Sequence, residues 1–98
     1  QGHVDGVARV ARMGRSGSST LLTLRLPPAL LRQVVLKGSL AVDGVSLTVA
    51  ELRGPLCRLA IIPETLARTR IGGYRPAEEV NIETDLVSKV VESLTRRP

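Results

Sequence analysis

Apolar and polar residues alternate along most of the chain, the pattern of β-strands that bury one face. Glycine, proline and small polar residues separate the alternating runs and favour turns there. Asp43-Gly44 predicts a tight hairpin, because both central residues of a type I′ turn need positive φ, and the small polar cluster at 14–19 predicts a hairpin loop. The runs predict a mainly β domain with strands at residues 6–13, 22–26, 39–42, 45–51, 56–62 and 79–84.

Helical periodicity is limited to three segments. Pro28 suits the first turn of a helix that Lys37-Gly38 ends, and Pro63 begins a helical turn over 63–68. From Asp85, a suitable N-cap, the period becomes helical, and this last helix must pack either on the domain itself or on another subunit. The apolar stripe of the first helix is formed by Leu30, Leu31, Val34 and Val35, and that of the last helix by Leu86, Val87, Val90, Val91 and Leu94.

Strands at this spacing favour a small closed barrel, because closure removes edges that a short chain cannot cover. A chain of 98 residues allows one domain. We expect the barrel over residues 1–85 and a C-terminal helix and tail over residues 86–98. The core must be aliphatic, since the chain has no Phe, no Trp and one Tyr. The lone Cys57 is expected in that core, with no disulfide and no metal site.

The chain carries 14 basic and 9 acidic residues, a net charge of +5 that would attract phosphates or other anions. The basic residues are scattered and lack interleaved aromatic residues, so we expect a solvated basic surface and no nucleic-acid partner. No apolar run is long enough to span a membrane and no leader pattern opens the sequence, so we expect a cytoplasmic protein. Because the chain begins at Gln1, within an apparently ordered segment, we interpret it as part of a longer chain.

Ser46 and Thr48 alternate with Val45, Leu47 and Val49, which places the two hydroxyl groups on the same face of the predicted strand. They form either an ordinary polar pair on the surface or the hydrogen-bonding wall of a pocket for a heteroaromatic ring. The alternation by itself leaves both interpretations open.

Few other polar residues stand out. His3, the only histidine, is either a surface residue or a proton carrier. Lys37 follows a predicted helix, and a cation at the C-terminus of a helix interacts favourably with the helix dipole, which is enough to explain this lysine. Glu64 and Thr65 fall in the first turn after Pro63, where backbone N–H groups could hold a ligand acceptor. No motif indicates a hydrolase triad, a kinase phosphate loop or a dinucleotide site.

Four motifs together resemble the second half of the riboflavin synthase family, which is a lumazine-binding domain. They are GHVDG at 2–6, KGSLAVDGVSLTV at 37–49, IPETL at 62–66 and VNIETD at 80–85. Their order and spacing are more specific than any one of them. The resemblance implies a Greek-key barrel followed by a helix, with the first barrel of the family absent from this chain.

The resemblance also implies an activity. Members of the family are transferases that move a four-carbon unit between two molecules of 6,7-dimethyl-8-ribityllumazine, giving riboflavin and a ribitylamino-pyrimidinedione, and no metal or organic cofactor is implied. Their active site lies between the first barrel of one subunit and the second barrel of a neighbour in a trimer. This chain would therefore be a half-site that needs the N-terminal barrel of a full-length chain, or a second copy in a barrel dimer. The alternative is a non-catalytic carrier of lumazine or flavin.

Site residues follow from the same resemblance. The catalytic candidates are His3, Ser46 and Asp85, with His3 and Asp85 as carriers of the proton lost from a ring methyl. Ser46 and Thr48 are expected to bind the ring edge, and Lys37 the ribityl or ring oxygens. The expected substrate-binding residues are Gly2, His3, Val4, Lys37, Ser46, Leu47, Thr48, Ile61, Ile62, Pro63, Glu64, Thr65 and Leu66.

Overall fold

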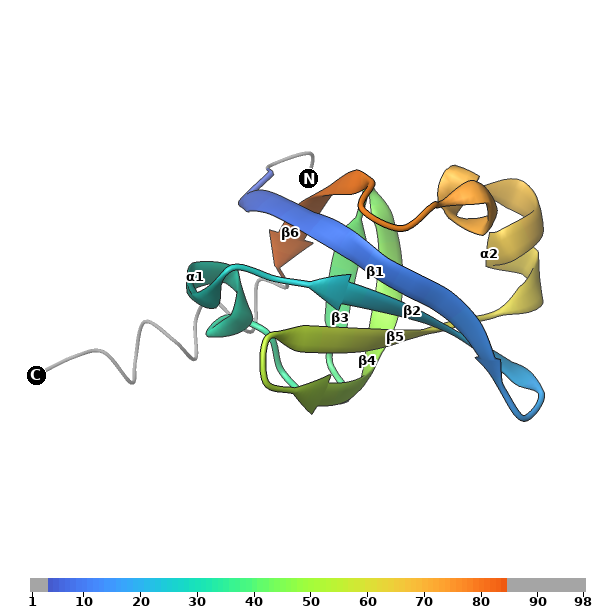
Figure 1. Ribbon diagram of the computed structural model, residues 1–98, viewed down its shortest axis with the longest axis horizontal. Helices are drawn as coiled ribbons and strands as arrows, with labels where there is room; N and C mark the ends of the chain where they lie inside the picture. The colour runs from blue at the N-terminus through green and yellow to red at the C-terminus, as the bar shows by residue number, and fades with distance from the viewer. Residues whose placement is uncertain (1–3, 85–98) are drawn as a thin grey trace, which may run out of the picture.

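A computed structural model describes residues 4–84, which form a closed antiparallel barrel (Figure 1). The helix predicted from Asp85 lies outside the described residues. The strands are β1 (Gly6–Ser16), β2 (Ser19–Arg25), β3 (Ser39–Val42), β4 (Val45–Arg53), β5 (Leu56–Ile61) and β6 (Glu79–Thr84). The connections contain two short α-helices and one 3₁₀ helix, which are α1 (Pro28–Leu31), α2 (Pro63–Arg68) and η1 (Arg70–Gly73).

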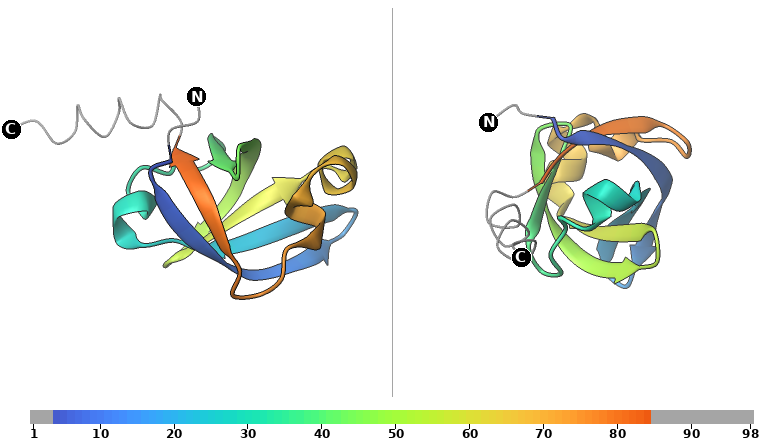
Figure 2. Two further views of the ribbon diagram at one scale, coloured as in Figure 1. Left: turned by 90° about the horizontal axis from the view of Figure 1, so that it is seen from above. Right: turned by 90° about the vertical axis from the view of Figure 1, so that its left-hand side faces the viewer.

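Around the barrel the strands follow the order β1-β2-β5-β4-β3-β6, and β6 closes the sheet against β1. Consecutive hairpins join β3, β4 and β5, and β6 returns to pair with β3, which is a Greek key. The predicted closed Greek-key barrel is confirmed. The helices α1 and α2 lie at opposite ends of the barrel (Figure 2).

The barrel interior is aliphatic, as predicted. Leu22 and Leu24 from β2, Leu59 from β5 and Ile82 from β6 belong to one cluster and have no exposed surface. Burying each side chain of this size contributes about 1.5–3 kcal/mol. Cys57 lies in the same cluster, where burial raises the pKa of its thiol to about 11.

The first hairpin is longer than the sequence predicts. Instead of a loop over 14–19, β1 and β2 continue to pair as far as Ser16 and Ser19, and only Gly17 and Ser18 form the turn. Gly17 has φ +63, a left-handed conformation that glycine adopts without strain. Polar residues fit strands here because this two-stranded ribbon projects beyond the core, so neither face needs apolar side chains (Figure 1).

The helix predicted from Pro28 is wrong in its length, because it ends at Leu31. The amide of Val34 donates to the carbonyl of Leu31, three residues back, so the chain tightens and leaves the helix. The adjacent β-branched Val34 and Val35 disfavour a further helical turn, and Val35 is exposed. Lys37 lies well beyond the helix with φ +70, so the structure also corrects its interpretation as a helix-terminal cation.

The remaining elements agree closely with the prediction. The Asp43-Gly44 hairpin is confirmed, with φ +48 and +85 at the two residues, and so is the helical turn that starts at Pro63. β4 runs two residues further than predicted, β5 ends one residue earlier, and η1 is not predicted by the sequence pattern. Within residues 4–84, no helix is long and apolar enough to cross a membrane.

Candidate functional site

Ser46 and Thr48 lie on the outer surface of β4, while Leu47 between them enters the core. The predicted orientation of the two hydroxyl groups is therefore confirmed. The strand register places Thr48 opposite Ser39 of β3 and opposite Ala60 of β5. Both neighbours are small, so within residues 4–84 no long side chain lies directly across from Thr48 on either neighbouring strand.

Ser46 has one small neighbour and one large apolar neighbour. It lies opposite Ala41 of β3, and the register of β4 and β5, continued by two residues, brings it opposite Ile62. Ile62 is 60% exposed, the largest exposed fraction among the large apolar residues that the structure describes. We call the open strip of surface formed by Ser39, Ala41, Ser46, Thr48, Ala60 and Ile62 the hydroxyl face.

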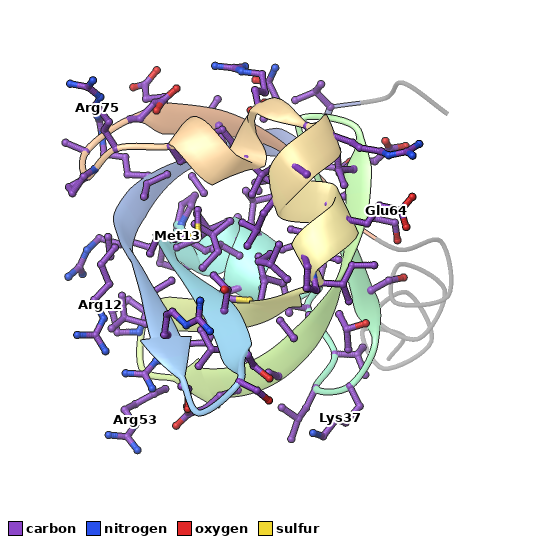
Figure 3. The ribbon with its side chains drawn as sticks, turned by 90° about the vertical axis from the view of Figure 1, so that its right-hand side faces the viewer. Arg12, Met13, Lys37, Arg53, Glu64 and Arg75 are labelled. Atoms are coloured by element: carbon purple, nitrogen blue, oxygen red, sulfur yellow. The ribbon has the colours of Figure 1, made fainter. Side chains whose placement is uncertain are left out.

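Lys37 lies at the other end of the hydroxyl face from Ile62. Its amide donates to the carbonyl of Val49 at 2.8 Å, so the segment that carries Lys37 runs beside β4. About four residues of β4 separate the two ends, a distance of about 13 Å. Lys37 and Glu64 project from the same flank of the barrel (Figure 3), and the exposed Leu36 adds apolar surface next to Lys37.

The α2 end of the face contains the other predicted residues. The exposed Glu64 pairs with Arg68 of its own helix at 3.5 Å. Thr65 is half-buried, and Leu66 packs against the core cluster. The side chains of Leu47 and Ile61 point into the core, so any contact of theirs with a ligand would involve backbone atoms.

The carboxylate of Asp43, at the β3–β4 turn, joins three elements. It accepts hydrogen bonds from the Tyr74 hydroxyl, from the Asn81 amide at 2.9 Å and from the Arg70 guanidinium at 3.3 Å. Burial raises the pKa of the Tyr74 phenol, and its hydrogen bond to Asp43 raises it further. Asp43 therefore ties η1 and the residue that follows it to both β6 and the β3–β4 hairpin.

The 3₁₀ helix η1 in turn supports α2. A Cβ atom on Gly72 would lie 2.5 Å from the carbonyl oxygen of Leu66, so only glycine permits this close approach. The Thr69 hydroxyl donates to the carbonyl of Thr65 at 2.7 Å and accepts from the amide of Ile71 at 3.2 Å. The position of α2, and with it the Ile62 end of the hydroxyl face, thus depends on the Asp43 contacts.

A pocket of about 480 Å³ adjoins the hydroxyl face. Val4 lines it, as does Ala41, the cross-strand neighbour of Ser46. Val4 therefore shares a pocket with one residue of the hydroxyl face, although neither Ser46 nor Thr48 lines that pocket. Gly2, His3 and Asp85 lie outside the described residues. The other lining residues are Asp43, Gly44, Arg70, Asn81, Ile82 and Glu83. Among residues 4–84, no group of three or more His, Cys, Asp and Glu side chains is placed to hold a metal ion.

Sequence reasoning found the hydroxyl pair but missed its small neighbours and the role of Asp43. Alternation shows whether a side chain faces inward or outward. It does not show that Thr48 lies between Ser39 and Ala60, because that depends on the register of three strands. Asp43 is predicted only as a turn residue, since its partners come from distant parts of the chain.

Comparison with known proteins connects this barrel to a family. Residues 1–85 match the family described as Lumazine binding domain. Riboflavin synthase of Actinobacillus pleuropneumoniae is 36% identical over 98 residues, which are 99% of this chain and 46% of that protein. Riboflavin synthase of Photobacterium phosphoreum is 39% identical over 93 residues, 95% of this chain and 43% of that protein. The chain therefore spans about half the length of the curated relatives it matches.

Solved structures with the same fold include LumP complexed with 6,7-dimethyl-8-(1'-D-ribityl) lumazine and LumP complexed with riboflavin. Both have a TM-score of 0.76, with 20% and 22% sequence identity. The matched regions cover 85% and 87% of this chain and 46% of each LumP chain. Together with the match over residues 1–85, this agreement shows that the chain belongs to the lumazine-binding domain family.

Proposed function

We propose that this chain is the second lumazine-binding barrel of a riboflavin synthase. It binds one 6,7-dimethyl-8-ribityllumazine and, with a partner barrel, transfers a four-carbon unit from one lumazine to another. The products are riboflavin and a ribitylamino-pyrimidinedione. Family membership and the riboflavin synthases among the relatives support the ligand class. The observation that carries the proposal is the pair of neighbouring hydroxyl groups on an open strip of mostly small residues.

The chemistry of the hydroxyl face suits a planar heteroaromatic ligand. Ser46 and Thr48 each offer one donor and two acceptor positions, which match a ring edge that alternates carbonyl and nitrogen groups. The small cross-strand neighbours Ser39, Ala41 and Ala60 let a flat ring approach the strands closely. Ile62 supplies an apolar edge, and Lys37, about 13 Å away along β4, is placed to reach the ribityl chain.

An open face suits half of an active site. The reaction needs removal of a proton from an acidified ring methyl and attack of the resulting carbanion on a second lumazine. Holding two lumazines in register between two barrels would supply much of the rate. In our proposal the second barrel is the N-terminal barrel of a full-length chain in a homotrimer, or a second copy of this barrel. His3 and Asp85 remain the proposed proton carriers, with Ser46 hydrogen-bonded to the ring.

A fluorescence titration with 6,7-dimethyl-8-ribityllumazine tests the site. We expect saturable binding to the parent chain, weakened by about 1–3 kcal/mol in Ser46→Ala/Thr48→Val because two hydrogen bonds are lost. The matched control is Ser18→Ala/Ser19→Ala, which removes two hydroxyls at the exposed tip of the β1–β2 hairpin and should leave binding unchanged. Unchanged affinity in Ser46→Ala/Thr48→Val would remove the hydroxyl face from the proposal.

A time course in the same samples tests catalysis. Riboflavin formed by the chain alone would mean that two copies assemble a working site. Binding without product is the result expected of a half-site, and addition of an N-terminal barrel from one of the relatives should then start riboflavin formation. Binding that never gives product in this mixture would favour the non-catalytic carrier.

A further inference from the structure

A second polar concavity lies on the neighbouring flank of the barrel, outside the surface assigned above. It is a pocket of about 130 Å³ on the outer side of β1, β2 and β5. We call this concavity the arginine pocket, and its lining residues are Arg12, Gly14, Arg15, Ser16, Leu21, Thr23 and Arg58. In Figure 3 one of them, Arg12, projects from the side of the view away from Lys37 and Glu64.

Strand pairing explains why the pocket forms. Arg12 of β1 pairs with Thr23 of β2, and Thr23 pairs with Arg58 of β5. Neighbouring strands lie about 4.8 Å apart, so the backbones of the two arginines are separated by about 10 Å with the threonine between them. Two long side chains therefore flank a short one, and Gly14 beside them adds no side chain at all. The result is a recess with cationic walls.

The arginines of this flank have too few acidic partners. Arg58 and Arg53 both pair with Glu51, each at 3.2 Å, so two cations share one carboxylate. Within residues 4–84, neither Arg12 nor Arg15 forms an ion pair. The pocket and its border thus hold four guanidinium groups and one carboxylate.

Thr23 provides a neutral donor at the base of the pocket. It is only 3% exposed, yet its hydroxyl has no hydrogen-bond partner among the described residues. Among the described residues, every fully buried side-chain oxygen has a hydrogen-bond partner. The Thr23 hydroxyl has none, so it is not fully buried and must open into the pocket that Thr23 lines. A nearly buried hydroxyl without a protein partner is a natural place for a ligand oxygen.

We propose that the arginine pocket binds a phosphate group, as inorganic phosphate or as a phosphate monoester. Guanidinium groups make strong charge-assisted hydrogen bonds to phosphate oxygens, and the Thr23 hydroxyl donates one more. A recess of about 130 Å³ has room for a compact tetrahedral anion. A bound dianion would also relieve the repulsion between Arg12, Arg15 and Arg58. This inference stands independently of the proposed lumazine function.

The test is a titration of the 98-residue chain with inorganic phosphate at constant ionic strength, with chloride as the reference anion, followed by backbone amide NMR. We expect saturable shifts confined to the amides around the pocket. Arg12→Gln should weaken binding about tenfold. Thr23→Val should weaken it several-fold, while Thr23→Ser, which keeps the hydroxyl, should retain it. Thermal unfolding of each variant confirms that the barrel is intact.

Arg25→Gln is the matched control. Arg25 lies on the same face of β2, two residues from Thr23, but outside the arginine pocket. The Arg25→Gln substitution removes the same charge as Arg12→Gln. It should weaken phosphate binding less than about twofold, because Arg25 acts on the anion only through long-range electrostatics. Equal weakening by Arg12→Gln and Arg25→Gln, or no saturable shifts, would overturn the proposal.

Two further ligands show whether the bound phosphate group comes from free phosphate, from a phosphate ester or from a nucleic acid. Tighter binding of phenyl phosphate than of inorganic phosphate would assign an organic phosphate ester, and equal or weaker binding would assign free phosphate. A short single-stranded RNA is the last probe. If it bound far more tightly than phosphate, with Arg25→Gln and Arg53→Gln as damaging as Arg12→Gln, the flank would be a nucleic-acid surface and the phosphate pocket would be overturned.

Discussion

The hydroxyl face and the arginine pocket lie on adjoining flanks of one barrel, and both use outward-facing residues of β5. Ala60 belongs to the first and Arg58, two residues earlier, to the second. On one side small neutral side chains leave an open strip that suits a planar ring. On the other, long cationic side chains around Thr23 make a recess that suits a compact anion. The comparison shows that strand pairing sets the positions, whereas the outward side chains select the ligand.

The two regions also depend differently on the rest of the molecule. The hydroxyl face is bordered by α2, which η1 and the contacts of Asp43 hold in place. The arginine pocket is formed by residues of three paired strands. A change at Asp43 should therefore separate the two regions.

Asp43→Ala should have the largest effect. The Tyr74 hydroxyl, the Asn81 amide and Arg70 lose their shared acceptor together, which should lower the free energy of unfolding by about 3 kcal/mol in urea denaturation. Lumazine binding should weaken and phosphate binding should not. In Asp43→Asn the asparagine tolerates φ +48 and keeps one acceptor oxygen, so the free energy of unfolding should fall less than in Asp43→Ala. If Asp43→Ala lost affinity for lumazine and for phosphate equally, the two regions would not be independent.

Raising the pH should have the next largest effect on the free energy of unfolding. The responsible group lies on β5, the strand that both regions share. Cys57 lies on the inner face of β5, where burial raises its thiol pKa from 9.0 to about 11. As pH rises from 9 to 11, the unfolded chain loses this proton while the folded chain retains it, so the free energy of unfolding falls. The expected loss is about 2 kcal/mol at the upper end.

Urea denaturation at each pH measures this loss, with Cys57→Ala as the comparison. That variant should show a shallower decline above pH 9, retaining the part due to Tyr74, whose phenol pKa is also raised. Identical slopes in the parent and Cys57→Ala would contradict the assignment of this pH dependence to the thiol.

The smallest effect on stability is expected from the ligand-contact variants themselves. Ser46→Ala/Thr48→Val and Arg12→Gln change exposed or partly exposed side chains and should alter the free energy of unfolding by no more than about 0.5 kcal/mol. Both variants should be titrated with both ligands. Ser46→Ala/Thr48→Val should lose affinity only for lumazine, and Arg12→Gln only for phosphate. A loss of lumazine affinity in Arg12→Gln would mean that the two regions form one site.

Several features of the fold could be predicted because their physics is local. Asp43-Gly44 predicts its hairpin since few residue pairs tolerate two positive φ angles. Pro63 predicts its helical turn since its missing N–H costs nothing there. The apolar stripe does not fix where α1 ends. Val34 and Val35 continue the stripe but disfavour a helix, and the hydrogen bond from the Val34 amide to the Leu31 carbonyl leads the chain out of it.

The family motifs, the aliphatic core and the inward or outward direction of most strand residues can all be recognised in the amino-acid sequence. Which outward residues are neighbours depends on how the strands pair in the folded barrel. Thr48 meets Ala60 across the β4–β5 hairpin. Thr23 lies between Arg12 and Arg58 because β2 pairs both with its hairpin partner β1 and with the distant β5. The physical reason is that alternation repeats every two residues in any strand, whereas register depends on closing the whole barrel around its core.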